Sequence, residues 1–381
     1  MKISCGKMAL LSALLPCVAA TTAVAGSLED SLKADSRSEI YGPKDDRLNL
    51  SDLSSDDAKD IDPALLAKLR TAADSVAALF KSDQVSGGNL TLYPYTEKLH
   101  NKYQLCKDVR FREEKTGSFC SGSLIGPNLI LTAGHCVLDQ DECDSTKVVF
   151  GWEIKEKNGA TPAAVNESDV YSCKKVLRAF YLDMMPENPK DKDKLDYSVI
   201  VLDREVKDRK PLVLNRKGNI KPGTKLAVIG HPAGLAKKII PAGKVRSTAS
   251  KIYFTTDLDT FVGNSGSPVF NINTMQVEGA LVRGGTDYVV ITPAANVEAV
   301  KQDWIVQRYG YDVEASTGSE TCIKYHNSPQ EGGRGEDVTR ASVIARLVSR
   351  AISEENKKKV KVPQTGKKAG KALSEGMKSL Q

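Results

Sequence analysis

The sequence lacks several features that define common protein classes. It has no Cys-x-x-Cys pair, the usual spacing of a structural zinc site. No apolar run after the first thirty residues is long enough to span a bilayer. Histidine is scarce, so few imidazoles are available for acid–base chemistry: His100, His135, His231 and His326. We therefore expect no metal site, no other cofactor and no membrane span.

The two ends of the chain differ in sign although the net charge is only +6. Residues 26–62 carry eleven acids and five bases, whereas residues 357–381 carry eight lysines and one acid. We interpret residues 26–72 as an acidic propeptide or N-terminal arm, loosely ordered up to about residue 60. The basic tail could contact a polyanion or a cell surface, but a solvated tail is the simpler interpretation.

The first 25 residues have the pattern of a secretory signal peptide. Lys2 and Lys7 precede the mostly apolar stretch Met8–Ala20, and Ala23-Val24-Ala25 offers a small-residue cleavage site. The pattern predicts a secreted or periplasmic protein whose mature chain begins at Gly26.

Six cysteines would remain in the mature chain, and an even number in an exported protein favours disulfides. A bridge between Cys120 and Cys136 would hold the loop that carries His135. Sequence proximity alone favours Cys143–Cys173 and Cys106–Cys322 among the three pairings open to the other four.

The middle of the chain has the pattern of a β protein. From about Val76 to Pro293, short apolar runs alternate with turn residues, which is typical of a sandwich or of barrels. Expected strands cover 121–125, 129–132, 147–150, 197–202, 225–230, 267–270, 279–282 and 287–291. Expected helices cover 64–73, 296–309 as an amphipathic helix that closes the domain, and 337–353 in a C-terminal extension.

Three motifs carry residues suited to nucleophilic catalysis. Gly263–Pro268 places Ser265 among small residues that allow a tight turn, with the amides of Gly263 and Ser265 as oxyanion donors. His135 follows an apolar strand in Thr-Ala-Gly-His-Cys and could act as the base. Asp196 opens the apolar run Asp-Tyr-Ser-Val-Ile-Val-Leu and could orient the imidazole. A strand-capping role is the simpler alternative for Asp196 taken alone.

These motifs, in the order His, Asp, Ser, resemble the chymotrypsin superfamily of serine proteases. Gly-Asn-Ser-Gly-Ser-Pro is similar to the bacterial glutamyl-endopeptidase-like, trypsin-like peptidase branch. The resemblance implies an all-β fold of two six-stranded antiparallel barrels, with a closing C-terminal helix and a helical or flexible tail. It covers roughly residues 73–312, so residues 313–381 would be an extension. It also departs from the trypsin pattern, because Asn264 cannot form the ion pair that activates trypsin-like enzymes.

The resemblance leaves the substrate side chain open. The wall segment after the nucleophile lacks the histidine of glutamyl endopeptidases, and its candidate substrate-binding residues are Val282, Arg283, Gly284 and Gly285. Asp259 lies six residues before Ser265, the position of a pocket-base carboxylate in trypsin-like enzymes, and would favour Arg or Lys substrates. A turn role for Asp259 and Thr260, or neutralisation of Asp259 by Arg283, is an alternative, and Asp257 is an equal candidate by composition.

The leading hypothesis is a secreted, monomeric serine endopeptidase that forms an acyl-enzyme with protein or peptide substrates. One rival is a non-catalytic binding or adhesion protein on a protease scaffold, which usually lacks a triad member. Another is glutamyl-type or other specificity within the same family. A third hypothesis is that the chain is a protease whose C-terminal tail localises it by binding a surface or a partner.

Overall fold

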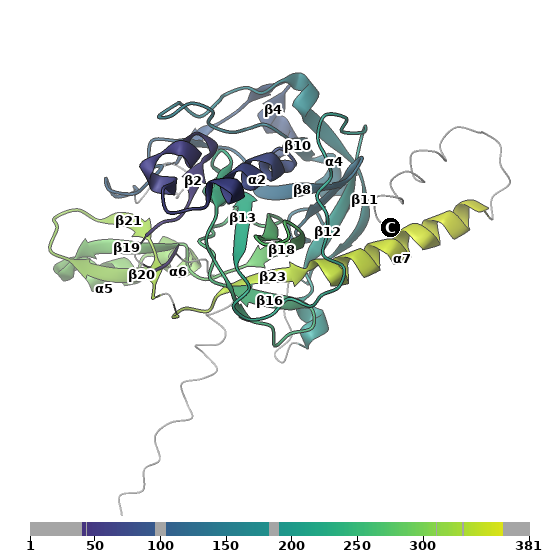
Figure 1. Cartoon of the computed structure of the whole chain (residues 1–381). Coiled ribbons are helices and arrows are strands. Elements are labelled where there is room, and N and C mark those ends of the chain that lie inside the picture. The colour runs from purple at the N-terminus through teal and green to yellow at the C-terminus, as the bar shows by residue number, and fades with distance from the viewer. Residues whose placement is uncertain are drawn as a thin grey trace, which may run out of the picture.

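The computed structural model describes residues 40–42, 44–95, 104–182, 190–309, 311–329 and 331–360. The predicted signal peptide and the lysine-rich stretch beyond residue 360 lie outside the described residues. Within them the chain is mostly β, with few helices (Figure 1). No helix in the described ranges is long and apolar enough to cross a membrane.

The first half of the described chain forms a closed antiparallel barrel. Its six strands follow the order β10-β11-β12-β9-β8-β3 around the barrel. The apolar runs of the sequence supply the strands because alternate side chains point inward, and Leu79, Leu124, Ile130 and Ile200 are fully buried there. The strands are β3 (Val76–Lys81), β8 (Cys120–Gly126), β9 (Leu129–Thr132), β10 (Thr146–Val149), β11 (Val170–Phe180) and β12 (Tyr197–Leu202).

The second half forms an eight-stranded sheet in the order β15-β16-β23-β18-β17-β13-β14-β2. An isolated bridge between Lys225 and Lys244 brings the start of β13 to β15, so the sheet curls like a half-barrel. A second closed barrel, as expected from the sequence, is not shown: the strands form an open order whose edge strand, β2, comes from the N-terminal arm and pairs with β14. The strands are β2 (Leu48–Asn49), β13 (Leu226–Gly230), β14 (Lys238–Ile240), β15 (Val245–Ser247), β16 (Tyr253–Thr256), β17 (Pro268–Asn271), β18 (Val277–Arg283) and β23 (Glu336–Arg340).

The chain beyond residue 335 returns to this sheet. β23 pairs antiparallel with both β16 and β18, so its five residues are buried inside the sheet. α7 (Ala341–Val360) follows directly, and its Ile344 and Val348 join the apolar cluster shared by both sheets. The expected helix over 337–353 thus begins four residues later, and the boundary expected at residue 312 falls within a strand.

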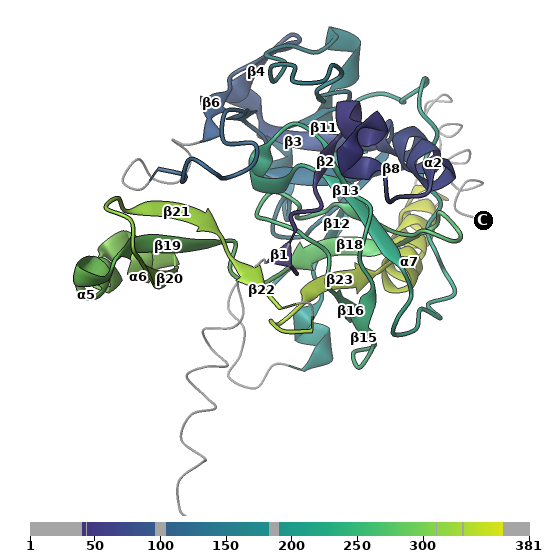
Figure 2. The same cartoon turned by 60° about the vertical axis from the view of Figure 1, so that its left-hand side comes forward.

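An inserted unit occupies the chain between β18 and β23. A three-stranded sheet in the order β20-β19-β21 carries two short helices, and it stands beside the rest of the molecule in both views (Figures 1 and 2). The helix expected over 296–309 is therefore two helices of this unit and does not close a barrel. Its elements are β19 (Tyr288–Pro293), α5 (Val297–Lys301), α6 (Trp304–Tyr309), β20 (Asp312–Ser316), β21 (Cys322–Tyr325) and β22 (Asn327–Ser328).

The N-terminal arm packs into the fold from residue 40 onward. β1 (Ile40–Tyr41) pairs with β22 of the inserted unit (Figure 2), and β2 pairs with β14 of the large sheet. Arg47 lies fully buried between these two pairings. The loose order expected up to residue 60 is therefore not found in residues 40–42 and 44–60, where Tyr41 and Leu48 are also buried.

The helix predicted over 64–73 is α2 (Pro63–Ala73), where Asp62 caps the first turn by accepting the Ala64 amide at 2.9 Å. The small elements are β4 (Val85–Ser86), β5 (Asn89–Leu90), β6 (Tyr93–Pro94), β7 (Lys115–Thr116) and α4 (Gln140–Asp144). The 3-10 helices are η1 (Leu50–Ser54), η2 (Asp56–Ala58), η3 (Ser82–Gln84), η4 (Glu167–Asp169), η5 (Asp191–Lys194), η6 (Pro232–Gly234) and η7 (Ala294–Asn296).

Candidate active site

The barrel brings His135 and Asp196 together at the ends of two paired strands. β9 and β12 are antiparallel neighbours, and the Ser198–Thr132 register places the residue before β12 beside the loop after β9. Asp196 Oδ2 lies 2.8 Å from His135 Nδ1. The Gly134 amide donates to Asp196 Oδ1 at 2.6 Å. A fully buried carboxylate with these donors fixes the ring orientation and makes Nδ1 the protonated nitrogen.

The Ser265 loop rests on the barrel strand β8. The Ser121 hydroxyl donates to the Gly263 carbonyl at 2.7 Å, and the Ser121 amide donates to the Ser265 carbonyl at 2.9 Å. Thr132, three residues before His135, donates to the Ser121 carbonyl at 2.7 Å. Through Ser121, the loop that carries Ser265 and the strand that leads to His135 are held against each other.

Two glycines permit this close approach. Gly266 has φ +86°, and a Cβ there would overlap the Ser121 carbonyl and the Thr132 hydroxyl. Gly263 has φ +94°, and a Cβ there would meet the His231 carbonyl at 2.6 Å. Any other residue at either position would strain the backbone. At Gly266 it would also push the loop off the barrel strands, and at Gly263 it would collide with the segment that follows β13.

The Ser265 hydroxyl makes no hydrogen bond to His135 among the described residues. The Ser265 carbonyl oxygen lies 3.8 Å from Cys136 Sγ, so the serine is next to the residue that follows the histidine. The Gly263 and Ser265 amides likewise donate no hydrogen bond within the described part of the chain. Both amides are therefore available for an oxygen atom held beside Ser265.

Three disulfides brace the molecule. Cys120–Cys136 ties the start of β8 to the histidine loop, Cys143–Cys173 ties α4 to β11, and Cys106–Cys322 ties the inserted unit to the segment before β7. These are the pairings that sequence proximity favoured. Cys120, His135 and Cys136 also place three potential ligand atoms within 4.8 Å. Because both sulfurs are joined in the disulfide, this group offers no thiolate to a metal.

Asp259 does not line an open pocket in this structure. One carboxylate oxygen accepts the Tyr41 amide at 2.8 Å, and the other accepts the Asp46 amide at 2.9 Å. The residue is 2% exposed, and burial raises the pKa of its carboxyl to about 8. The N-terminal arm therefore occupies the position in which we expected a substrate side chain.

Arg283 lies away from Asp259 and next to the candidate triad. Its Nη2 donates to the Lys194 carbonyl at 2.8 Å, and its Nη1 lies 3.8 Å from Asp196 Oδ2. Neutralisation of Asp259 by Arg283 is thus not what the structure shows, because the two side chains have different partners. Val282, the preceding residue, is buried in the barrel core.

The remaining wall residues, Gly284 and Gly285, contact a carboxylate that sequence reasoning missed. Glu336 is fully buried and accepts hydrogen bonds from the Gly285 amide at 3.1 Å and from the Thr260 hydroxyl. A Cβ on Gly284 would overlap this carboxylate. The sequence around Glu336 gave no indication of this role, because its polar residues are typical of the start of an exposed extension and not of a buried strand.

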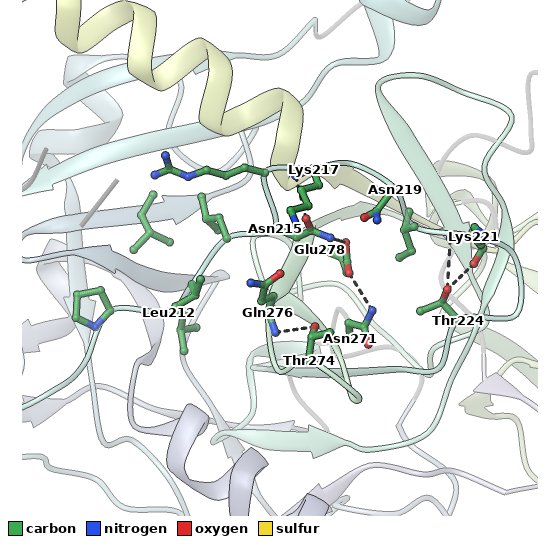
Figure 3. A pocket seen from close by; sticks show the side chains of 16 residues that line it. Leu212, Asn215, Lys217, Asn219, Lys221, Thr224, Asn271, Thr274, Gln276 and Glu278 are labelled. Atoms are coloured by element: carbon green, nitrogen blue, oxygen red, sulfur yellow. Dashed lines mark hydrogen bonds between the residues drawn. The ribbon is translucent and has the colours of Figure 1, made fainter. Parts of the chain in front are cut away.

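A separate cavity of about 730 Å³ opens between the 211–224 segment and the β17–β18 hairpin (Figure 3). At its floor, the buried Glu278 accepts one hydrogen bond each from Asn215 at 2.8 Å and Asn271 at 3.0 Å. Both carboxylate oxygens thus have partners within the protein. None of His135, Asp196 and Ser265 lines this cavity, so it is not the site defined by the three motifs.

One family of known proteins matches the central part of the chain. Residues 120–279, somewhat less than half of the chain, match the family model described as trypsin-like peptidase domain. No curated protein sequence matches the chain. The match and the mostly β fold support the class of chymotrypsin-like serine proteases, and hence a peptidase.

Two solved structures are similar in part. One is an inactive serine-to-alanine mutant of Rv3671c from M. tuberculosis H37Rv, with 13% identity over 80% of this chain and 97% of that chain, at a TM-score of 0.37. The other is the inactive form of Rv3671c protease, with 14% identity over 76% of this chain and 96% of that chain, at a TM-score of 0.36.

Proposed function

We propose that the chain is a serine endopeptidase that works through Ser265, His135 and Asp196. The observation that carries the proposal is the hydrogen bond between His135 Nδ1 and the buried Asp196, beside the glycine-framed loop of Ser265. In the reaction, His135 Nε2 takes the proton of the Ser265 hydroxyl as its oxygen attacks the substrate carbonyl. We expect the hydrogen bond between Ser265 and His135 to form when substrate binds, because catalytic hydrogen bonds tighten in the enzyme–substrate complex.

The remaining steps use the same groups. The Gly263 and Ser265 amides bind the oxyanion of the tetrahedral intermediate, and Asp196 stabilises the imidazolium. His135 then returns the proton to the leaving amine, which leaves an acyl group on Ser265. Water, deprotonated by His135, attacks this ester and releases the second product.

We further propose basic rather than acidic side chains at the cleavage position. The buried carboxyl of Glu336 accepts the Gly285 amide in the 281–285 wall segment, and a carboxylate there disfavours a glutamate substrate. Glutamyl specificity has no supporting histidine in that segment. Because the arm binds Asp259 directly, we assign Glu336 the larger role in selecting the substrate side chain while the arm is docked.

The localisation and partners follow from this proposal. Three disulfides fit an extracellular or periplasmic protein. Protein or peptide segments are the proposed substrates, handled by a monomer. A contact of the lysine-rich tail with a polyanion or a cell surface stays a prediction.

Labelling of the purified chain with a fluorophosphonate tests the proposed chemistry. We expect the wild type to be labelled, Ser265→Ala to be unlabelled, and Asp196→Asn to react about 10⁴-fold more slowly because the imidazole adopts the wrong tautomer. Ser247→Ala on β15 serves as the matched serine control and keeps its label. A folded wild type that never reacts would favour the non-catalytic binding protein instead.

A further inference from the structure

The orienting carboxylate has a second cationic neighbour besides the histidine. Arg283 is the last residue of β18, and its side chain is only 11% exposed. Its Nη1 lies 3.8 Å from Asp196 Oδ2, the same oxygen that contacts His135 Nδ1 at 2.8 Å. A single buried oxygen atom therefore lies between an imidazole and a guanidinium.

The guanidinium is held in this place by groups from three other elements. Asp337 of β23 faces Nε at 3.4 Å, and Nη2 donates to the Lys194 carbonyl. The ring of Tyr253 on β16 lies 5.7 Å from the guanidinium carbon. These contacts use Nε and Nη2, whereas Nη1 has no hydrogen-bond partner among the described residues and faces Asp196. The positive charge of Arg283 therefore lies next to Asp196, although the 3.8 Å between Nη1 and Oδ2 is too long for a hydrogen bond.

Other charges around Arg283 only partly neutralise it. Asp337 Oδ2 also binds Arg334 Nη2 at 2.7 Å, so this carboxylate is shared between two guanidinium groups. The Lys194 ammonium lies 6.0 Å from the centre of the same Tyr253 ring. The charged groups around the site are therefore three cations, Arg283, Arg334 and Lys194, and three carboxyl groups, Asp196, Asp337 and the buried Glu336 that accepts the Gly285 amide. The Tyr181 ring also packs on the imidazole, with the ring centres 5.5 Å apart.

We propose that Arg283 is a positioning residue that sets the pH range of His135 by acting through Asp196. The inference rests on the proposed peptidase function of the same site. A fixed positive charge beside Asp196 Oδ2 opposes the second positive charge that forms when His135 binds a proton. The guanidinium stays charged at every working pH. His135 is thereby kept neutral, and able to act as a base, at lower pH than Asp196 alone would allow.

Nuclear magnetic resonance of the four histidine rings tests the inference without requiring activity. The His135 signal is assigned by its loss in His135→Gln, and its titration midpoint is compared among variants. We expect Arg283→Gln to move this midpoint upward by roughly one pH unit. Arg283→Lys, which keeps the charge, should stay close to the wild type. Arg334→Gln is the matched control, because it removes a guanidinium from the same Asp337 without changing the group that faces Asp196.

The rate of fluorophosphonate labelling gives the second readout, and its acidic limb should move upward with the titration midpoint in Arg283→Gln. If Arg283→Gln does not fold, the double variant Arg283→Gln/Asp337→Asn is used, because it removes both members of the buried pair. Its His135 titration midpoint is then compared with that of the single variant Asp337→Asn. An unchanged midpoint in whichever of these comparisons folds would overturn the role of Arg283. Absence of labelling at every pH would instead defeat the peptidase proposal and leave the titration result standing.

Discussion

Asp259 is the residue whose environment differs most from that expected for a substrate pocket. Its carboxyl is buried and has a pKa of about 8, chiefly because burial disfavours the charged form; the Tyr41 and Asp46 amides partly oppose this effect. In the unfolded chain the same group titrates near its ordinary value of 3.8. The folded state therefore binds the extra proton between about pH 4 and pH 8.

From this difference we predict that Asp259 makes the free energy of unfolding fall as pH rises. The folded chain binds more protons than the unfolded chain in this window, so the contribution is present near pH 4 and is lost as pH approaches 8. Urea unfolding at pH 5 and pH 8 measures it. Asp259→Asn, which does not titrate, should show a smaller loss between these pH values, by about 1–3 kcal/mol. Equal slopes in the two proteins would rule out this environment for Asp259.

The sequence singles out candidate residues where the signal lies in their neighbours along the chain. His135, Asp196 and Ser265 could be selected from short motifs, since the glycines, the cysteine and the apolar runs beside them lie within a few positions. The partners of Asp259 and Arg283 could not be selected in this way. Tyr41 precedes Asp259 by 218 residues and Asp337 follows Arg283 by 54, and only the sheet pairings bring them together.

Among the elements, the N-terminal arm shows how a polar segment becomes part of a core. Arg47 is fully buried, with two hydrogen bonds to the Asp45 carboxylate at 2.9 and 2.7 Å. Its guanidinium lies 4.0 Å from the ring centre of Phe261 and 4.3 Å from that of Tyr325. The arm is thus anchored to the segment before the nucleophile and to the inserted unit at once.

Arg47→Met should destabilise the folded chain by about 3–5 kcal/mol, because it leaves the buried Asp45 carboxylate without its main partner. Methionine keeps most of the apolar contact with the rings. Arg110→Met is the matched control, since Arg110 also approaches Asp45, at 3.7 Å, but is one-third exposed. We expect the control to lose no more than about 1 kcal/mol in urea unfolding. Similar losses in both variants would contradict the arm as an anchored element.

Element prediction succeeded for apolar strands and failed for charged ones. The run that forms β12 is almost wholly apolar and was assigned from sequence. β23 reads Glu-Asp-Val-Thr-Arg, and all five of its residues are buried. Its charges are accommodated by buried partners, such as Arg283 for Asp337 and two backbone carbonyls for Arg340. Since polarity in a sequence normally indicates exposure, no local pattern distinguishes such a strand from the start of a surface helix.

At the scale of the whole molecule, the chain leaves the large sheet after β18 and returns to it at β23. The residues between them form the inserted unit, which is joined to the segment before β7 by Cys106–Cys322 and to the arm by the β1–β22 pairing. A boundary near residue 312 is reasonable from composition because polar segments follow it. The structure instead closes the large sheet with the last 25 described residues, so the fold depends on both ends of the chain.

This closure determines which C-terminal truncations the fold can tolerate. Ending the chain at Gly335 would remove β23 from between β16 and β18, together with the buried Ile344 and Val348 of α7. We expect this truncation to abolish cooperative unfolding and labelling, since each lost large apolar side chain alone costs about 2–5 kcal/mol. Ending it at Val360 keeps every described contact and should retain both properties.

The truncation that ends at Val360 can then test whether the lysine-rich tail binds the protein to a surface. It removes five of the eight lysines in the basic stretch but neither β23 nor α7. If the full chain binds a negatively charged matrix and the truncated chain does not, while both are still labelled, the tail has a role in binding surfaces. If the Gly335 truncation instead unfolded with the same midpoint as the full chain, β23 and α7 would not be part of the folded unit.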